Sequence, residues 1–579
     1  METTPEKQHA ADTRCRKRPL FSHDESTVHH VVFQKPEVSI PGPRNHDERF
    51  EWPHRQWKRY SSAERDRLIR NMTRLRFCTR FTGAVNAQQT IFYMIITFLN
   101  TLLADKIECP REIQACEKEP LRRKVLLSCD HVTTKHLCGN ILDRFVPEVR
   151  EEIDRALPDP KASVQARAMA NRQVQLLMRS SFEKLGSRAI STACELHPGE
   201  SCYDACIPQF DVFNCDSADE GDEDDDEKFL YFTSMGAPCK DCSAQNQFAS
   251  GEAGVTHVAT CCALEEHRHS GRHILWYECT PRAKADVVAE SQRDDTQTFS
   301  TILSGHPIGD PVSRPRMTAV NLQPTIHLCR PLEEYYQVAG CKCIMDVDDL
   351  FDDEPSWAAG EINELSNMKS RDSDAKTWLD VMLPSQRERL EWYQKNLDSL
   401  VRLGYVLPDK AMVFDLDQSQ NRPRMSQNLP TILTHGMLYH STKHTVLTAL
   451  HQCQCQGFPV REEQRLRYGG LIDFEDNLNT ELYTRRELVG FLGGDLPQFP
   501  RSFLRQLLQP HRFLASQRLQ LRCFLLRSLF LLSCRRPLPR GLRLCFLRLL
   551  PSFRLRLRLF VVAEQAQLRE QVGREWLCS

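Results

Sequence analysis

Apolar residues follow a helix-strand-helix pattern over positions 61–104. Ser61-Ser62-Ala63-Glu64 has the form of a capping box and predicts the start of a helix. The run 75–81, which ends just before Gly83, predicts a strand. The apolar run 91–104 predicts a buried helix, because a bilayer span needs about 20 residues. Strand, glycine turn and buried helix in this order are typical of the start of an open parallel α/β sheet.

The same pattern returns after a long interruption. Segments 149–157 and 165–185 are amphipathic and predict helices, and the acidic run 216–227 predicts a solvated loop. Strand-like segments resume at 229–232, 273–277 and 317–320. From about 320 to 425 the pattern predicts mixed helix and loop, with a second acidic patch at 346–354.

Both ends of the chain depart from this pattern. Residues 1–55 are polar, show no periodicity and are expected to be mostly disordered. No acidic residue occurs between Asp495 and Glu564, and the recurring arginines exclude a transmembrane span there. This Arg/Leu-rich tail could be a basic amphipathic surface for anionic lipid or nucleic acid. We favour the alternative, that 496–579 is not a folded domain.

Composition narrows the class of protein. A chain of 579 residues with 41% hydrophobic and 26% charged residues fits a soluble protein of several regions. The formal net charge of −1 means that any nucleic-acid surface must be a local patch. The N-terminus has no predicted secretory signal, so we expect the 24 cysteines to lie in a reducing compartment. The basic cluster 14–18 is a possible nuclear address, and the expected location is nuclear or cytoplasmic.

Cys239 is the most informative cysteine. It follows a predicted strand and the turn Gly236-Ala237-Pro238, which would present it at the carboxyl edge of the sheet. Three interpretations are open: an inert free thiol, one half of a redox or zinc pair with Cys242, or a nucleophile.

This segment resembles the catalytic motif of the cytosine-C5 methyltransferases, G-F-P-C-Q-x-x-S. Gly236, Pro238, Cys239 and Ser243 match, whereas Ala237 and Lys240 differ. Further blocks of that family follow in its usual order. The resemblance covers roughly 70–145 and 229–495, and it implies a Rossmann-like S-adenosylmethionine-dependent methyltransferase sheet with a smaller target-recognition region.

The cofactor blocks of the family are matched in part. Phe81 and Gly83 resemble the F-x-G-x-G loop, although Val85 replaces its second glycine. Glu117 resembles the acid that takes the ribose hydroxyls. Asn140 resembles the acid of the G-D-I block beside the adenine, with an amide in place of a carboxylate. The resemblance therefore implies that these residues and Pro238 bind S-adenosyl-L-methionine.

The catalytic blocks are matched more closely. Glu278 resembles the acid of the E-N-V block and lies 39 positions after Cys239, close to the family's usual separation, although Cys279 replaces the asparagine. Arg314 and Arg316 resemble the Q-x-R-x-R block. Segment 384–389 is an alternative candidate whose residues match the block more closely. However, it runs into a predicted helix, whereas the block should enter a strand.

The resemblance implies a specific chemistry. Cytosine C5 is a poor nucleophile, and a thiolate added to C6 turns it into an enamine carbon. Positive neighbours such as Lys240, Arg314 and Arg316 would help to ionise Cys239. Glu278 would stabilise charge on the ring from N3 and the exocyclic amine. The expected partner is DNA, with RNA as the alternative, and the base would be flipped out of the stack.

The remaining blocks complete the predicted organisation. Segments 428–434, 455–459 and 493–495 resemble the C-terminal blocks, although the last lacks its asparagine. The predicted regions are 1–55 (disordered extension), 56–145 (cofactor-binding half), 146–228 (insertion with acidic loop), 229–320 (catalytic half), 321–425 (target recognition), 426–495 (C-terminal blocks) and 496–579 (tail).

Two alternatives stay open at this level. Cysteines at 202, 206, 215, 261 and 262 and histidines at 267, 269 and 273 are residue types that suit zinc, but their spacings match no known finger, and no metal is predicted. The departures at Val85, Asn140 and Cys279 leave open a non-catalytic relative that binds nucleic acid or a partner.

Overall fold

The structure of the chain is a computed structural model. It describes residues 28–32, 40–83, 86–128, 134–190, 194–198, 230–237, 242, 251–270, 274–292, 296–305, 309–312, 315–328, 331–334, 340–351, 355–368, 375–418, 424–430 and 436–470. Val85, Pro238, Cys239, Lys240 and Arg314 lie outside these ranges, as do segments 216–227 and 471–579. Among the described helices, none is long and apolar enough to cross a membrane.

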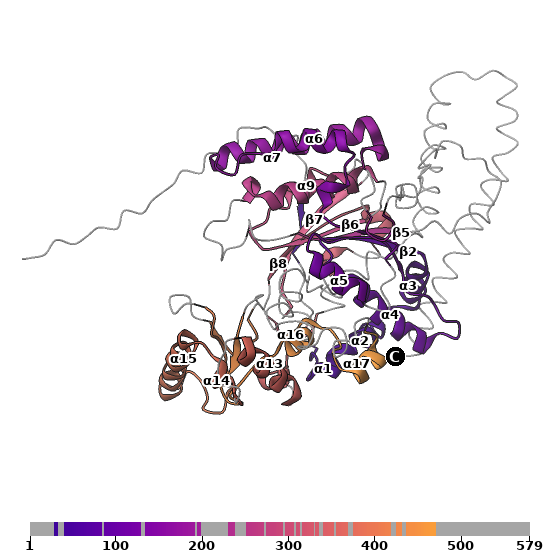
Figure 1. Cartoon of the computed structure of the whole chain (residues 1–579). Helices are drawn as coiled ribbons and strands as arrows, with labels where there is room; N and C mark the ends of the chain where they lie inside the picture. Colours follow the sequence, from indigo (N-terminus) through magenta and orange to yellow (C-terminus); the bar gives the residue numbers. More distant parts are fainter. Residues whose placement is uncertain are drawn as a thin grey trace, which may run out of the picture. The chain divides into compact units, whose positions relative to one another are not determined.

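A mostly parallel eight-stranded sheet forms the centre of the fold (Figure 1). Its order is β1-β7-β8-β6-β5-β2-β3-β4, and only β8 runs antiparallel to its neighbours. The strands are β1 (Val28–His30), β2 (Leu75–Arg80), β3 (Arg111–Cys116), β4 (His136–Cys138), β5 (Leu230–Gly236), β6 (Ile274–Cys279), β7 (Gln297–Leu303) and β8 (Arg316–Leu322). The predicted fold class, an α/β Rossmann-like sheet, is confirmed.

The strand order reverses between β2 and β5. From β2 the chain proceeds outward to β3 and β4, then returns to the other side of β2 for β5 and β6. Open parallel sheets bind ligands outside the carboxyl ends of their strands at such a switch point. The loops after β2 and β5 are therefore the first place to look for a site.

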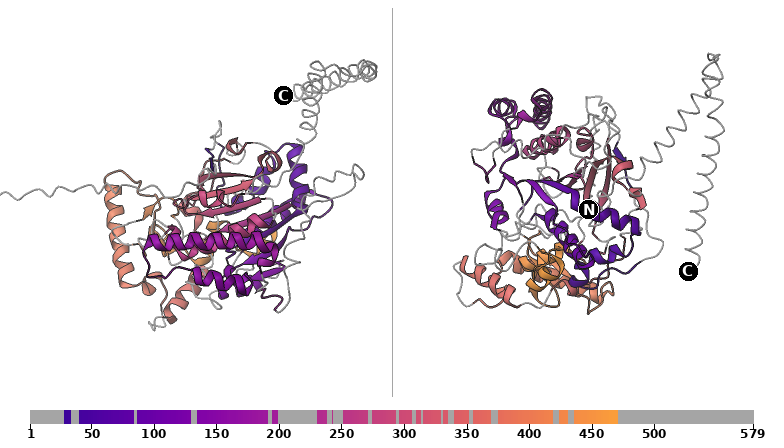
Figure 2. Two further views of the ribbon diagram at one scale, coloured as in Figure 1. Left: turned by 90° about the horizontal axis from the view of Figure 1, so that it is seen from above. Right: turned by 90° about the vertical axis from the view of Figure 1, so that its right-hand side faces the viewer.

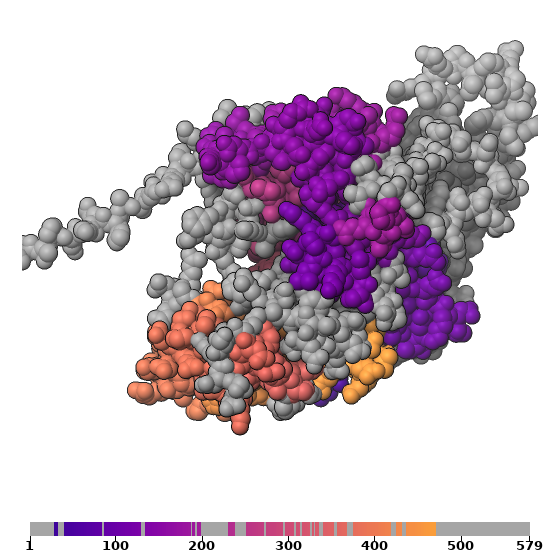
Figure 3. All heavy atoms as spheres, in the orientation of Figure 1, coloured from indigo at the N-terminus to yellow at the C-terminus, as the bar shows by residue number. Residues whose placement is uncertain are grey.

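Helices cover both faces of the sheet. On one face, Leu68 of α3 (Ser62–Arg74) and Phe92 of α4 (Ala87–Leu102) join a core cluster with Phe232 and Trp276. On the other face, α9 (Val255–His269) contributes Cys261 and Leu264, and α7 (Val164–Leu185) packs outside it. α6 (Pro147–Ala156) runs beside α7 (Figure 2). Both helices form part of the molecular surface (Figure 3).

The local signals in the sequence explain where these elements begin. The Glu64 backbone N–H donates to the Ser61 hydroxyl oxygen over 3.3 Å, and the Ser61 N–H donates to the Glu64 carboxylate over 2.9 Å. This is the predicted capping box, which satisfies two N–H groups that the first helical turn leaves unpaired. The predicted strands at 75–81, 229–232, 273–277 and 317–320 correspond to β2, β5, β6 and β8.

The expected disorder of residues 1–55 is wrong for the part of this segment that the structure describes. β1 pairs in parallel with β7, and α1 (His46–Phe50) and α2 (Trp52–Trp57) follow. Phe50 and Trp52 lie in the core, and buried Arg49 pairs with Asp310 at 2.7 Å. These partners lie hundreds of positions away, so local periodicity could not reveal them.

A second, antiparallel sheet has the order β10-β9-β11-β12. Its strands are β9 (Val413–Asp415), β10 (Met425–Ser426), β11 (Leu438–His440) and β12 (Thr445–Val446). The predicted boundary at residue 425 divides this sheet, because β9 pairs directly with β11. Strands of two or three residues are too short to show an alternating pattern.

α5 (Pro120–Ser128) also packs against the central sheet, because its Leu126 forms a buried cluster with Ala115 of β3 and Leu137 of β4. The other described helices are α10 (Asp286–Ala289), α11 (Pro324–His327), α13 (Pro355–Met368), α14 (Trp378–Val381), α15 (Pro384–Arg402), α16 (Ala449–Gln456) and α17 (Glu462–Tyr468). Tyr393 of α15 stacks on Phe414 of β9, with ring centroids 5.1 Å apart. Tyr468 of α17 contacts Phe50 of α1 and joins the core beneath α4.

Glu112 on β3 gives the fold a specific pH dependence. Burial raises the pKa of this carboxyl to about 7, although Thr79 and Asn86 donate hydrogen bonds to it. The folded state therefore retains a proton that the unfolded state loses above pH 4.5. Stability should fall by about 3 kcal/mol as pH rises through this window.

We expect Glu112→Gln to remove this loss. The free energy of unfolding in urea, measured from pH 4 to pH 8 for variant and wild type, should diverge in favour of the variant as pH rises. Exposed Glu108, at 84% side-chain exposure, supplies the control Glu108→Gln. Parallel pH curves for Glu112→Gln and wild type would contradict the assignment.

Candidate functional site

Five parallel strands bring the sequence-predicted residues to one edge of the sheet. Phe81 and Gly83 follow β2, Glu117 follows β3, and Asn140 follows β4. Glu278 lies near the end of β6, with Gly236 of β5 beside it in register. Because parallel strands share a direction, their carboxyl ends meet at the same edge.

The turn after β2 is bound closely to the turn after β3. The Gly83 N–H donates to one carboxylate oxygen of Glu117 over 2.8 Å, and the Glu119 N–H donates to the other over 2.9 Å. Glu117 is only 6% exposed. Thr82 adds a reciprocal backbone and hydroxyl pairing with Cys116. The two loops that the sequence assigned to cofactor binding therefore form one hydrogen-bonded unit.

This turn has an unusual backbone. Phe81 has φ +59° and Gly83 has φ +72°, both in the left-handed region. Such a conformation costs a bulky residue about 1–3 kcal/mol, and it is found where surrounding contacts over-determine the backbone. A Cβ built on Gly83 meets no heavy atom of the described chain within 4 Å, so open space adjoins the turn.

Asn140 acts as a helix cap in this structure. Its side-chain oxygen accepts from the Leu142 N–H over 3.4 Å, and its amide donates to Asp143 over 3.1 Å. It begins the 3-10 helix Ile141–Arg144. The side chain is half-buried at the same sheet edge as Glu117.

The catalytic half of the site has one defined ion pair. The Arg316 guanidinium Nε lies 2.7 Å from a carboxylate oxygen of Glu278, and the two side chains are 12% and 7% exposed. Arg316 begins β8, which pairs antiparallel with β6, so the sheet itself brings the two residues together. The rival segment 384–389 begins the long helix α15, as its pattern predicted.

The described flanks of the Cys239 segment both contact the end of β6. The Cys279 thiol lies 4.0 Å from the Ala237 carbonyl oxygen, and the Thr280 hydroxyl donates to the Cys242 carbonyl over 3.3 Å. A hydrogen bond with Cys242, together with burial, raises the pKa of Cys279. Cys279 is therefore a protonated thiol at neutral pH. Cys239, Pro238 and Arg314 lie outside the described residues.

A cavity of about 310 Å³ lies on the other face of β6. Its lining includes Tyr277, Cys279, His257 and the ion pair between Lys284 and Glu252. Side chains alternate along a strand, so Glu278 faces away from this cavity. The cavity and the Glu278–Arg316 pair are consequently separate features of the strand end.

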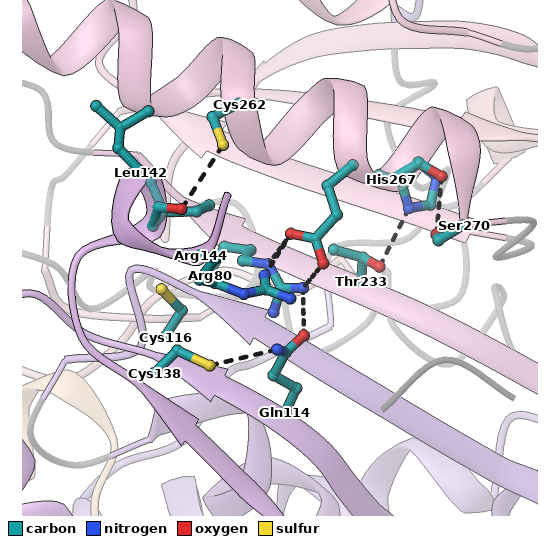
Figure 4. A network of polar contacts seen from close by, with 12 residues as sticks. Arg80, Gln114, Cys116, Cys138, Leu142, Arg144, Thr233, Cys262, His267 and Ser270 are labelled. Carbon is teal, nitrogen blue, oxygen red and sulfur yellow. Dashed lines mark hydrogen bonds and ion pairs between the residues drawn. The ribbon is translucent and has the colours of Figure 1, made fainter. Parts of the chain in front are cut away.

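A buried charge network, which no sequence motif predicted, links the end of β2 to α9 next to the site (Figure 4). Arg80 and Arg144 both bind the Glu266 carboxylate, at 2.7 and 2.6 Å, and Arg80 also donates to Gln114 over 2.7 Å. The three charged side chains are at most 4% exposed. The network fixes the end of β2, directly before Phe81, to α9. A charged residue at the end of a predicted strand that continues into a glycine turn, Arg80, was the available signal.

No protein-family model matches the chain, and no curated protein matches it. Among solved structures, it is similar to a putative DNA modification methyltransferase encoded within an E. coli prophage, with 11% identity, a TM-score of 0.35, and coverage of 75% of this chain and 98% of that one. It is also similar to S. pombe Dnmt2 methyltransferase, with 12% identity, the same coverages and a TM-score of 0.34. For the Entamoeba histolytica methyltransferase EhMeth the identity is 11%, the TM-score 0.31 and the coverages again 75% and 98%. Likenesses this low transfer no activity, substrate or residue role to this chain.

Proposed function

We propose that the chain is an S-adenosylmethionine-dependent methyltransferase that methylates cytosine C5 in DNA through a covalent adduct on Cys239. One observation carries the proposal. Glu278 and Arg316, which the motif order assigned to one catalytic site from separate blocks, form a largely buried ion pair at the carboxyl edge of the sheet. The two residues that follow Glu278 contact the described residues on either side of the Cys239 segment. Cys279 contacts Ala237, and Thr280 contacts Cys242.

The residues of the cofactor half fit S-adenosylmethionine in part. Each Glu117 oxygen accepts one backbone hydrogen bond, and a carboxylate has about four acceptor sites, so capacity remains for ribose hydroxyls. Gly83 adjoins open space where Phe81 and Gly83 would hold the methionine portion. When bound, the cofactor supplies an electrophilic methyl group. Asn140 and Pro238 would complete its site.

The side chains of the catalytic half would have separate roles in the reaction of the cytosine ring. The Cys239 thiolate forms a bond to C6, and the electron pair of the C5–C6 double bond makes C5 nucleophilic. Glu278 would hydrogen-bond N3 and the exocyclic amine as charge builds on the ring. Arg316 positions that carboxyl group. After transfer, the C5 proton is lost to solvent, and its bonding electron pair re-forms the C5–C6 double bond as the C6–S bond breaks and the Cys239 thiolate leaves.

In the region expected to contact DNA, the described acidic residues Asp346, Asp348 and Asp349 lie against other protein groups. Asp346 and Asp349 form a capping box, and Asp346 also binds Lys410 at 2.6 Å. Asp348 lies 3.0 Å from His440, while Val347 and Leu350 are buried. Partnered carboxylates repel phosphate less than free ones, which is compatible with nucleic acid nearby.

Covalent trapping tests the proposal. Mixed-sequence DNA duplexes and RNA that contain 5-fluorocytosine should each be incubated with the protein and S-adenosylmethionine, since fluorine at C5 blocks release of the enzyme. We expect a denaturation-resistant adduct with DNA, its complete loss in Cys239→Ser, and its retention in Cys242→Ser. No adduct with either nucleic acid, or one that survives Cys239→Ser, would rule out the mechanism. An adduct with RNA alone would move the substrate to RNA.

A non-catalytic relative that binds nucleic acid or a partner is the second candidate. The observation in its favour is that Asn140 is engaged as a helix cap and that Cys279 is a buried protonated thiol where the family has an asparagine. Thermal stability with S-adenosylmethionine separates the two. A rise in melting temperature favours the enzyme, and an unchanged value favours the non-catalytic relative.

A further inference from the structure

Three metal-ligating side chains converge at the outer edge of the central sheet. The Cys194 sulfur lies 3.8 Å from Nδ1 of His136 and 3.6 Å from Nδ1 of His197. One ligating atom from each residue lies within 4.8 Å of the other two. The imidazole rings are tilted by 56°, with centroids 5.1 Å apart, so they meet around the sulfur rather than stack on each other.

The backbone holds these residues in place. His136 begins β4, the last strand on this side of the sheet, and is 5% exposed. The backbone of Cys194 pairs with that of Cys138 in an isolated antiparallel β-bridge, both thiols being free, and the Glu195 N–H donates to the Leu137 carbonyl over 2.8 Å. Segment 194–198 is thus added to the edge of β4. His197, half-buried, is three positions after Cys194.

The two sulfur–nitrogen separations match those around a tetrahedral zinc ion. Zn–S bonds of about 2.3 Å and Zn–N bonds of about 2.0–2.1 Å place sulfur and nitrogen ligands roughly 3.5 Å apart. Both sulfur–nitrogen distances are within 0.3 Å of that value. Thiolate and imidazole are also the ligands that zinc prefers. Hydrogen bonds between a neutral thiol and neutral rings are the competing explanation, and they would give no metal affinity.

We propose that His136, Cys194 and His197 bind a zinc ion that fastens segment 194–198 to the edge of the central sheet. The Cys194 thiol loses its proton to solvent as the Zn–S bond forms, and water occupies the fourth position on the side of half-buried His197. This site is separate from the cysteines and histidines considered in the sequence. His136 and Cys194 are 58 positions apart, which no finger spacing reveals.

The zinc site has a structural consequence for the loop after β3. Glu195, next to Cys194, binds Arg123 at 2.7 Å. Arg123 in turn donates to the carbonyl oxygens of Glu117 and Lys118 over 2.9 and 2.7 Å. Metal binding would therefore stabilise the loop that carries Glu117. Only this consequence rests on the proposed function, whereas the metal site itself does not.

Cobalt substitution tests the site without an activity assay. The full chain should be stripped with a chelator and titrated with Co²⁺, then with Zn²⁺ in competition. We expect a sulfur-to-cobalt charge-transfer band in the near ultraviolet that Zn²⁺ abolishes. Cys194→Ala should lose this band. His197→Gln, at a half-buried position that is less demanding for folding, should weaken Zn²⁺ binding by at least about 100-fold.

Cys109→Ala is the control, because Cys109 is a half-buried free cysteine just before β3 that lies outside the cluster. It should keep both the band and the affinity. A protein that gives no charge-transfer band, or a band unchanged in both Cys194→Ala and His197→Gln, would overturn the proposal. Covalent trapping on Cys239 is independent of these readouts, so failure of one proposal is distinguishable from failure of the other.

Discussion

Glu278→Gln is expected to lower the rate of methyl transfer by about 10²–10⁴-fold, the range over which a positioned proton-transfer group contributes. The substitution preserves the shape of a side chain that is 7% exposed but removes its charge and its capacity to exchange a proton. Because the effect arises as charge develops on the ring, kcat should fall and the KM for DNA should change little. Tritium transfer from labelled S-adenosylmethionine to DNA measures both.

The position of Glu278 also predicts how its partner behaves. Arg316→Gln removes the 2.7 Å ion pair, and the double variant should be less impaired than the sum of the two single effects, because both act through one interaction. Glu252→Gln is the control, since Glu252 pairs with Lys284 at an exposed site. Wild-type kcat in Glu278→Gln, or additive effects in the double variant, would contradict the assigned roles.

Glu266→Gln is expected to destabilise the protein by about 3–5 kcal/mol. Glu266 is 2% exposed and balances two buried guanidinium groups, Arg80 and Arg144. Removing one partner of a buried ion pair leaves charge without compensation in a medium of low polarity, which is the costly case. The pKa of Arg144 shows the same balance: burial has the largest influence and lowers it, but the Glu266 carboxylate and the neighbouring cysteines together raise it above its ordinary value, and both arginines stay charged.

The measurement is the free energy of urea unfolding followed by tryptophan fluorescence. Buried Trp276 lies on β6, in the same sheet as the network. An exposed ion pair should contribute far less to stability than a buried one. Glu252→Gln is therefore expected to lower the free energy of unfolding by less than about 1 kcal/mol. Equal effects of Glu266→Gln and Glu252→Gln would mean that the buried network contributes no special stability.

Local sequence signals determined most of the central elements. The Ser61–Glu64 capping box, the apolar strands at 75–81 and 273–277 and the buried helix at 91–104 depend on neighbouring residues only, and each is found in the structure. The choice of Arg316 over segment 384–389 was decided in the same way, by strand against helix. Motif order assigned Glu278 and Arg316 to one site, and they are in contact.

Other features depended on contacts between distant positions. Residues 1–55 looked like a polar extension, yet helix α1 within them is held by Asp310, by the carbonyls of Gln454 and Cys455, and by Tyr468. The short strands around residue 425 exist only because they pair with one another. Neither kind of contact leaves a periodic trace in the chain.

The sequence by itself determined the class of fold, the positions of strands β2, β5, β6 and β8 and the residue types available for chemistry, because helix and strand patterns are local. Only the tertiary structure decided which of these residues meet. It gave Glu117 two backbone partners, engaged Asn140 as a helix cap, placed Arg80 and Arg144 on Glu266, and gathered His136, Cys194 and His197 at a sheet edge. Each of these contacts depends on which strands lie side by side. This lateral order of the strands is set by packing of the whole sheet.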